Sequence, residues 1–472
     1  MEEKNCVYDD LLTPIDEISV EEVSSLIEEY ITNKKYRELR DLLSDIAAPD
    51  IAEIFSETDK STHTLVFRLL PKELAAETFV EMDPETQERL IGSFSDRELS
   101  EMLSELYIDD TVDIIEEMPA TVVKRILKSS TPADREMINT ILHYPKNSAG
   151  TVMTTEYVRL REGMVVFEAL EHIRRVALDK ETVYTSYVTD RDRHLLGMVT
   201  ARQLLISDPD TPLSDIMDSN IVFAYTDDDR EEVALKFHKY GFLAMPVVDR
   251  EHRLVGIITM DDAISVLNEE SEEDFAKMAA ITTSAETPYL KTSVFDIWKT
   301  RIPWLVILMI SATVSSTILA SFESALPAVL VLFVPMLMGT SGNSGGQSSV
   351  TVIRSLSHME IEFSDLWRVF WKELRVGILC GLTLGVATFI KVELVERLLL
   401  GNSDVTLIVA LTVSLSLTVT IILAKVVGAI LPIVAKRIGL DPAVMASPLI
   451  TTVVDALSLI VYFYIAKSIL GL

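Results

Sequence analysis

The sequence predicts a multi-domain membrane protein, with an all-α superhelical N-domain and a tandem α/β pair ahead of a five-helix transmembrane domain. Three observations lead to this fold class. Residues 301–472 contain five long apolar runs, and an α/β pattern occurs twice in residues 150–268. Acidic residues outnumber basic ones by 62 to 31 in residues 1–300, whereas 10 acidic and 11 basic residues follow. This acidic surface argues against nucleic acid as a partner and suits cations.

The apolar runs are long enough to cross a lipid bilayer, which takes about 20 helical residues. Basic residues gather in alternate loops, which favours the cytoplasmic side for these loops. We therefore expect a multi-pass protein of the cell (inner) membrane, with cytoplasmic N-terminal domains and an external C-terminus. The expected spans are 303–322, from near 325 into 335–350, 376–394, 405–434 and 443–470.

Residues 1–145 are expected to form the acidic helical N-domain. Its turns are marked by proline, and Pro49, Pro84 and Pro119 recur at a constant spacing. Each opens a helical pattern, as proline does at a first helical position. The spacing predicts a short helical solenoid, and chance spacing within an all-helical domain is the alternative.

Residues 146–268 repeat one pattern of helix, short strands and an acid-rich hairpin, DRDRHLLG in the first copy and DREHRLVG in the second. The two copies resemble a pair of cystathionine-β-synthase (CBS) domains, which implies a regulatory module. No nucleophile accompanied by a base is evident, so we do not expect an enzyme. An acid-headed helical segment, 269–300, then leads to the membrane, where its position indicates a coupling role.

The stretch PMLMGTSGNSGGQSSV, residues 335–350, is a polar interruption of the second span. Polar backbone at membrane depth is tolerated only where it is buried in protein or lines a water-filled cavity. Close helix packing is the alternative explanation for the glycines, but it explains Asn343 and Gln347 less well. We therefore expect this stretch to border water.

Asp455 lies near the middle of the last span, where an ionisable residue costs about 2.5–3.5 kcal/mol on insertion scales. An ion pair with Lys425 of the fourth span is one explanation, and a cation site on an aqueous path is the other. Mg²⁺ prefers oxygen ligands and sheds its water reluctantly, so one carboxylate with neutral oxygens suits it. The neutral oxygens offered nearby are those of Thr340, Asn343, Ser344 and Gln347.

These two motifs, in the order helical domain, CBS pair, connecting helix and five spans, resemble the MgtE family of magnesium channels over essentially the whole chain. The resemblance implies a Mg²⁺ uptake channel that is a homodimer in membrane lipid, with Asp455 of both copies holding hydrated Mg²⁺. It also implies that Asn343 and the backbone carbonyl of Thr451 belong to the ion path. Ser447 stands where the family often has Asn, which puts the discrimination among cations in doubt.

The resemblance further implies that cytoplasmic Mg²⁺ closes the pore by bridging acidic faces of the N-domain, the CBS pair and the connecting, or plug, helix. Gly241 and Ser265 stand where family members can carry Asp, which leaves the number of sensor ions open. Divalent ions also offset the like-charge repulsion between acidic domains. The matching acids are Asp109, Asp113, Asp229, Glu231, Asp262, Glu270, Glu273, Asp274 and Asp441.

Two other interpretations stay open. The cargo could be a different divalent ion such as Co²⁺ or Mn²⁺, although an oxygen-only site argues against softer metals. Thr259 and Asp262 resemble the ribose-binding pair of CBS domains, which implies ATP as a modulator. The first repeat has Thr200 and Gln203 at the corresponding positions and lacks the acid, so at most one nucleotide site is expected.

Overall fold

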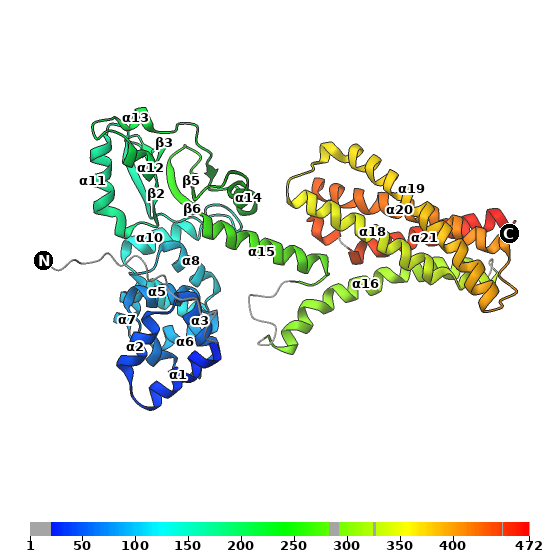
Figure 1. Ribbon diagram of the computed structural model, residues 1–472, viewed down its shortest axis with the longest axis horizontal. Helices are drawn as coiled ribbons and strands as arrows, with labels where there is room; N and C mark the ends of the chain where they lie inside the picture. Colours follow the sequence, from blue (N-terminus) through cyan, green and yellow to red (C-terminus); the bar gives the residue numbers. More distant parts are fainter. Residues whose placement is uncertain (1–19, 283–291, 324–326, 446, 472) are drawn as a thin grey trace. The chain divides into compact units, whose positions relative to one another are not determined.

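The computed structural model describes residues 20–282, 292–323, 327–445 and 447–471 (Figure 1). The chain forms two compact units that divide between Leu267 and Asn268. The first unit contains the N-terminal helices and the two α/β repeats. The second contains the end of the connecting helix and the long apolar helices.

Ten helices make up the N-terminal part of the first unit, within the residues that the structure describes (Figure 1). Pro49 and Pro84 lie in the first turns of α3 and α6, and Pro119 is the N-cap of α9, in line with the predicted repeat. The helices bury one continuous apolar core, which includes the buried side chains of Phe55 and Phe79. The helices are α1 (Val20–Thr32), α2 (Tyr36–Ser44), α3 (Ala48–Glu57), α4 (His63–Phe67), α5 (Lys72–Val80), α6 (Pro84–Ser93), α7 (Asp96–Leu103), α8 (Ile108–Glu117), α9 (Ala120–Ser129) and α10 (Pro132–Ile141).

Two α/β repeats follow, each built on a three-stranded sheet whose first two strands are parallel and whose last two are antiparallel. The first contains β1 (Tyr157–Arg161), α11 (Val166–Val176), η2 (Ala177–Asp179), β2 (Thr182–Thr189), β3 (Leu195–Thr200), α12 (Ala201–Ile206) and α13 (Leu213–Ile216). The second contains β4 (Ala224–Tyr225), α14 (Arg230–Tyr240), β5 (Ala244–Val248) and β6 (Leu254–Thr259).

The acids of the two predicted hairpins have a structural role. Asp190 Oδ1 accepts hydrogen bonds from the backbone N–H groups of Asp192 and His194 at 2.9 and 2.8 Å. Asp249 makes the equivalent bonds in the second repeat. Each carboxylate therefore closes the turn that its sequence motif predicts.

Helix α15 (Met260–Met278) follows β6 directly, so it begins before the predicted connecting segment does. Asp262 explains this start, because its Oδ2 accepts a hydrogen bond from Thr259 Oγ1 at 2.5 Å, in the manner of a helix cap. Residues 283–291 of the predicted 269–300 segment lie outside the described residues.

Five segments of the second unit are long and apolar enough to cross a membrane, which confirms the predicted transmembrane domain: Val294–Phe322, Ala328–Ser357, Phe363–Leu399, Leu407–Arg437 and Pro442–Leu470. Their elements are α16 (Val294–Glu323), α17 (Ala328–Val331), α18 (Val334–Ser357), η3 (Phe363–Asp365), α19 (Leu366–Lys391), η4 (Val392–Leu399, a π-helix), α20 (Leu407–Arg437), η5 (Pro442–Met445) and α21 (Ser447–Leu470).

The polar stretch 335–350 does not interrupt the helix, because it lies inside continuous α18. A helix satisfies its own backbone groups at membrane depth, which outweighs the low helix propensity of its glycines. The glycines serve close packing. A Cβ atom added to Gly428 of α20 would lie 2.2 Å from the carbonyl oxygen of Gly345, so the two backbones meet directly.

Candidate functional site

The central feature of the membrane unit is Asp455 of α21, beside Gly342 of α18. A Cβ atom added to Gly342 would lie 3.4 Å from Asp455 Oδ1 and 2.8 Å from Thr451 Cγ2. Asp455 Oδ1 is buried and has no hydrogen-bond partner among the described residues. A carboxylate oxygen in this situation favours a cation or water as its partner.

Helix α18 also carries a polar face, which begins at Asn343, the residue after Gly342. Asn343 and Gln347 are one helical turn apart, and both are exposed in the single chain. They line a pocket of about 820 Å³ together with Thr351 of α18, Glu373 of α19 and Lys425 of α20. Polar side chains exposed along the middle of a membrane helix are costly against lipid, so this face requires water or protein as its neighbour.

Lys425 is only 6% exposed, and it does not form the ion pair with Asp455 that the sequence left open. Its Nζ instead donates to Gln347 Oε1 at 3.2 Å. One lone pair of the Gln347 oxygen is therefore engaged by an ammonium. This contact weakens Gln347 as a ligand for hydrated Mg²⁺, and leaves Asn343 as the better placed amide.

The other predicted path residues differ in their surroundings. Ser344 is buried, Thr340 is half-buried, and Thr451 lies against Gly342. Ser447 begins α21, but its side chain lies outside what the structure describes. The buried serines of α18 join helices: Ser458 Oγ of α21 donates to Ser341 Oγ at 2.8 Å.

A second group of acids lies at the end of α15. Glu273, Asp274 and Asp441 come together here, and they surround Lys277, a residue that motif matching did not single out. Although burial lowers the pKa of Lys277, its hydrogen bonds to Asp441 and Glu273 outweigh this and raise the pKa to about 12. Glu270 lies one turn earlier on the same helix.

A third group of acids lies in the first unit, where α8 of the N-domain meets the first repeat and the start of α15. It contains Asp109 and Asp110 of α8, Glu156 and Glu181 of the first repeat, and Asp262. Asp109 Oδ1 and Glu181 Oε2 are buried without a hydrogen-bond partner among the described residues. We call these five residues the acidic cluster.

Burial and mutual repulsion raise the pKa values of the acidic cluster. Burial, followed by the charges of Asp110 and Asp262, raises the pKa of Asp109 well above its usual range. Burial and the charge of Asp262 raise the pKa of Asp110 to about 6 and that of Glu181 to about 7. These carboxylates accordingly favour a proton or a bound cation. Their oxygens are ligands that Mg²⁺ prefers.

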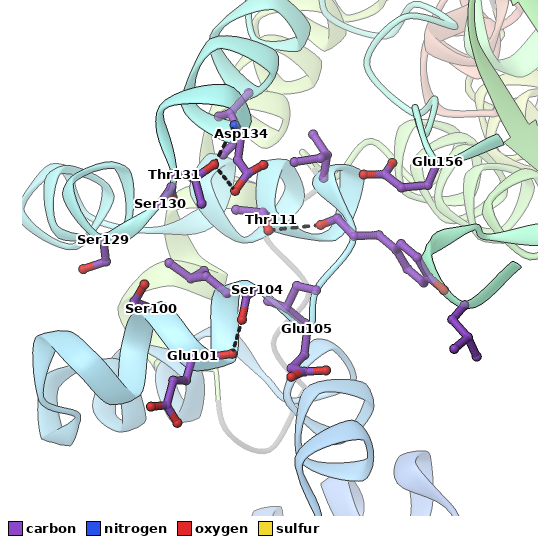
Figure 2. Close-up of a pocket in the computed structure, with 16 residues that line it drawn as sticks. Ser100, Glu101, Ser104, Glu105, Thr111, Ser129, Ser130, Thr131, Asp134 and Glu156 are labelled. Atoms are coloured by element: carbon purple, nitrogen blue, oxygen red, sulfur yellow. Dashed lines mark hydrogen bonds between the residues drawn. The ribbon is translucent and has the colours of Figure 1, made fainter. Parts of the chain in front are cut away.

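Glu156 also lines a pocket of about 450 Å³ in the same unit (Figure 2). Figure 2 shows hydroxyl groups around this pocket, including those of Thr111 on α8, of Ser129 at the end of α9, and of Ser130 and Thr131 between α9 and α10. Through Glu156, the acidic cluster thus borders a pocket that is lined by hydroxyl groups. The sequence motifs gave no signal for Glu156 and Glu181, because only the fold brings the starts of β1 and β2 to α8.

Several predicted sensor residues have local structural roles. Asp109 is buried in the acidic cluster, whereas Asp113 is exposed. Asp229 is the N-cap of α14 and accepts hydrogen bonds from the N–H groups of Glu231 and Glu232. Ser265 is exposed on α15, next to the acidic start of that helix.

Gly241 ends α14 with φ at +66°, a conformation that a residue with a Cβ atom adopts at a cost. Glycine, in place of the Asp that the family resemblance allows at this position, therefore suits the left-handed backbone conformation here. The predicted nucleotide-binding pair, Thr259 and Asp262, is joined by a hydrogen bond, and Asp262 lies near other acids. The nucleotide-binding role of this pair stays a prediction.

Comparison with known proteins identifies the N-domain, the two α/β repeats and most of the membrane unit. The MgtE divalent cation transporter model matches residues 334–465, the MgtE intracellular N domain model matches 46–147, and the CBS domain model matches 149–209 and 213–269. The soluble part of a magnesium transporter has a crystal structure that is 28% identical, with a TM-score of 0.50, over 54% of this chain and 100% of that one. The cytosolic domain of the Mg²⁺ channel MgtE in complex with ATP is 36% identical, with a TM-score of 0.49, over 52% and 99%.

Full-length relatives agree with these matches. The magnesium transporter MgtE of Thermus thermophilus is 37% identical over 456 residues, which are 95% of this chain and 99% of the relative. The protein of the same name from Bacillus subtilis is 30% identical over 92% of this chain and 94% of its own. These relatives are transporters, which confirms that the chain is not an enzyme. The chain belongs to the MgtE family of divalent cation transporters.

Proposed function

We propose that this protein carries Mg²⁺ into the cell along a path that includes Asp455 and the polar face of α18. The observation that carries the proposal is Asp455 Oδ1, a buried oxygen without a partner among the described residues. Asn343, which follows Gly342 on α18, offers a neutral amide oxygen, and the magnesium transporters named above match the chain over nearly its whole length.

A second copy of the chain completes the path. Asn343 and Gln347 are exposed at helical spacing in the single chain, where lipid is an unfavourable neighbour. A homodimer that joins two such faces around water gives them a polar surrounding and brings two Asp455 carboxylates to one axis. The basic loops favour cytoplasmic N-terminal domains, which leaves the C-terminus outside.

Uptake by proteoliposomes tests this path. Asp455→Asn keeps the size of the side chain and removes its charge, so we expect Mg²⁺ uptake to fall by about two orders of magnitude or more. Asp404→Asn makes the same chemical change at an exposed loop position and should leave uptake unchanged. Normal uptake by Asp455→Asn would refute the path.

Cytoplasmic Mg²⁺ closes the path by binding at acidic sites of both units. The acidic cluster has the donor set for this ion, with buried carboxylate oxygens that have no partner among the described residues. Bound Mg²⁺ offsets the repulsion that raises the pKa values of Asp109, Asp110 and Glu181. Glu273, Asp274 and Asp441 provide three further carboxylates in the second unit, around Lys277.

Limited proteolysis of the full-length protein in lipid nanodiscs tests closure. Protection of the N-domain should rise with Mg²⁺, and Asp109→Asn should require more Mg²⁺ for the same protection. Asp41→Asn, at an exposed position of α2, is a matched control. Protection that does not change with Mg²⁺ contradicts closure and leaves the path intact.

Mg²⁺ is preferred to Co²⁺ as the cargo because the residues near Asp455 offer oxygen ligands, whereas Co²⁺ also accepts softer ones. Oxygen ligands suit Mn²⁺ as well as Mg²⁺. Competition by Co²⁺ and Mn²⁺ during Mg²⁺ uptake decides among the three cargoes. We also propose that ATP binds at Thr259 and Asp262 as a modulator. Calorimetric titration of ATP without Mg²⁺ tests this by comparing ATP binding to the wild type and to Thr259→Ala.

A further inference from the structure

A lysine of the chain occupies the acidic site at the end of α15. Lys277 Nζ lies 2.6 Å from Glu273 Oε1 and 2.6 Å from Asp441 Oδ2. Its side chain is only 26% exposed. Asp274 lies close enough for its charge to interact with both Lys277 and Asp441, and its own Oδ2 accepts a hydrogen bond from Ser357 at 3.0 Å.

The surroundings hold this arrangement in place. Asp441 Oδ1 accepts a hydrogen bond from the N–H of Ala443 at 2.8 Å, which orients Oδ2 toward the ammonium. Met278, the residue after Lys277, packs against Ile353 and Ala443. The ammonium is therefore presented between carboxylates from two distant parts of the sequence, as a bound metal ion would be.

We infer that Lys277 is a built-in competitor for Mg²⁺ at this site and thereby determines the Mg²⁺ concentration at which the protein closes. The inference rests on the closure proposed above. Mg²⁺ takes ligand oxygens at about 2.0–2.1 Å, so it must displace an ammonium that already holds the same oxygens. When no Mg²⁺ is bound, the Lys277 ammonium supplies one positive charge and keeps α15 in contact with Asp441.

Removing a competing charge and removing a purely structural lysine should shift the Mg²⁺ concentration needed for closure in opposite directions. A unit charge and a divalent ion about 4 Å apart repel each other appreciably even in a water-like surrounding, so removing the ammonium should strengthen Mg²⁺ binding about tenfold. A lysine that only stabilised the closed form would have the reverse effect. Its removal would destabilise the closed form, so a higher Mg²⁺ concentration would be needed for closure.

The experiment follows closure of full-length protein in nanodiscs, with Mg²⁺ alone as the added ion. Proteinase K is suitable because it does not depend on the lysine. We expect Lys277→Gln to lower the Mg²⁺ midpoint of protection about tenfold, and Lys277→Arg to stay within about twofold of wild type. A midpoint that Lys277→Gln leaves unchanged or raises overturns the inference alone. A wild type without any Mg²⁺ dependence overturns the closure and the inference together.

Chemical rescue separates charge from folding. Lys277→Cys is made in a chain with Cys6→Ser and Cys380→Ser, and the folded protein is divided into two samples. Alkylation with 2-bromoethylamine restores an ammonium, whereas iodoacetamide leaves a neutral side chain. The ammonium adduct should return the midpoint to the wild-type value while the neutral adduct stays about tenfold lower. Equal midpoints for the two adducts overturn the inference.

Discussion

Lys425 of α20 holds the side-chain oxygen of Gln347 of α18 through a hydrogen bond of 3.2 Å. The ammonium is almost fully buried at membrane depth, where an isolated charge is costly. The amide oxygen offsets part of this cost and places the positive charge on the wall of the pocket that Asn343 also lines.

Lys425→Met tests whether this charge faces the ion path. A fixed positive charge beside the path opposes entry of a dication, so we expect the KM for Mg²⁺ uptake to fall by roughly threefold. Lys467→Met, at an exposed position near the end of α21, should have no such effect. An unchanged KM for Lys425→Met means that the ammonium lies away from the path.

Gly428→Ala tests the contact between α20 and α18. The added methyl group meets the backbone of Gly345, which cannot rotate away as a side chain can, so stability should fall by about 1–3 kcal/mol. Gly339→Ala is the control, since a Cβ atom there meets nothing within 4 Å. The measurement is the unfolding temperature in detergent, and equal temperatures for both variants would contradict the packing described for Gly428.

The acidic cluster predicts that packing of the N-domain depends on pH. Asp110 and Glu181 have their pKa values raised from 3.8 to about 6 and from 4.5 to about 7. The packed state therefore binds extra protons, and its stability is lost as pH rises through these raised values. Without divalent ions, we expect stronger protease protection near about pH 5 than near about pH 8.

Two controls sharpen the pH prediction. Saturating Mg²⁺ should flatten the pH dependence, because the ion takes the place of the protons. Glu181→Gln should reduce the difference in protease protection between low and high pH, because the variant lacks one titrating group. Equal protection at both pH values in the absence of divalent ions is the contrary result.

Asp229 distinguishes a sensor from a helix cap. Asp229→Ala removes the acceptor for two N–H groups of α14 and should destabilise the first unit by about 0.5–2 kcal/mol. Asp229→Asn keeps an acceptor oxygen, so stability should stay near that of wild type. If Asp229→Asn nevertheless raises the Mg²⁺ needed for closure, Asp229 also binds the ion.

The sequence predicted the domain order, the five membrane helices and the proline-marked helices, because periodicity, apolar length and proline act locally. The helical state of residues 335–350 was missed, because glycine and serine suggest a turn unless the requirement for backbone hydrogen bonds in lipid is given more weight. Glu156, Glu181 and Lys277 were missed for another reason. Each acts through partners brought near by the fold, although the i, i+4 spacing of Glu273 and Lys277 was a usable signal.

The direct backbone contact between Gly345 and Gly428 limits how the membrane unit can change shape. With no side chain between them, α18 and α20 have little room to slide or rotate past each other, so we expect them to move together. The junction of α18 with α21 is different, because Gly342 there faces the side chains of Thr451 and Asp455, which can adopt other rotamers. We therefore expect motion that widens the proposed ion path to occur at the junction of α18 with α21, which contains the membrane carboxylate.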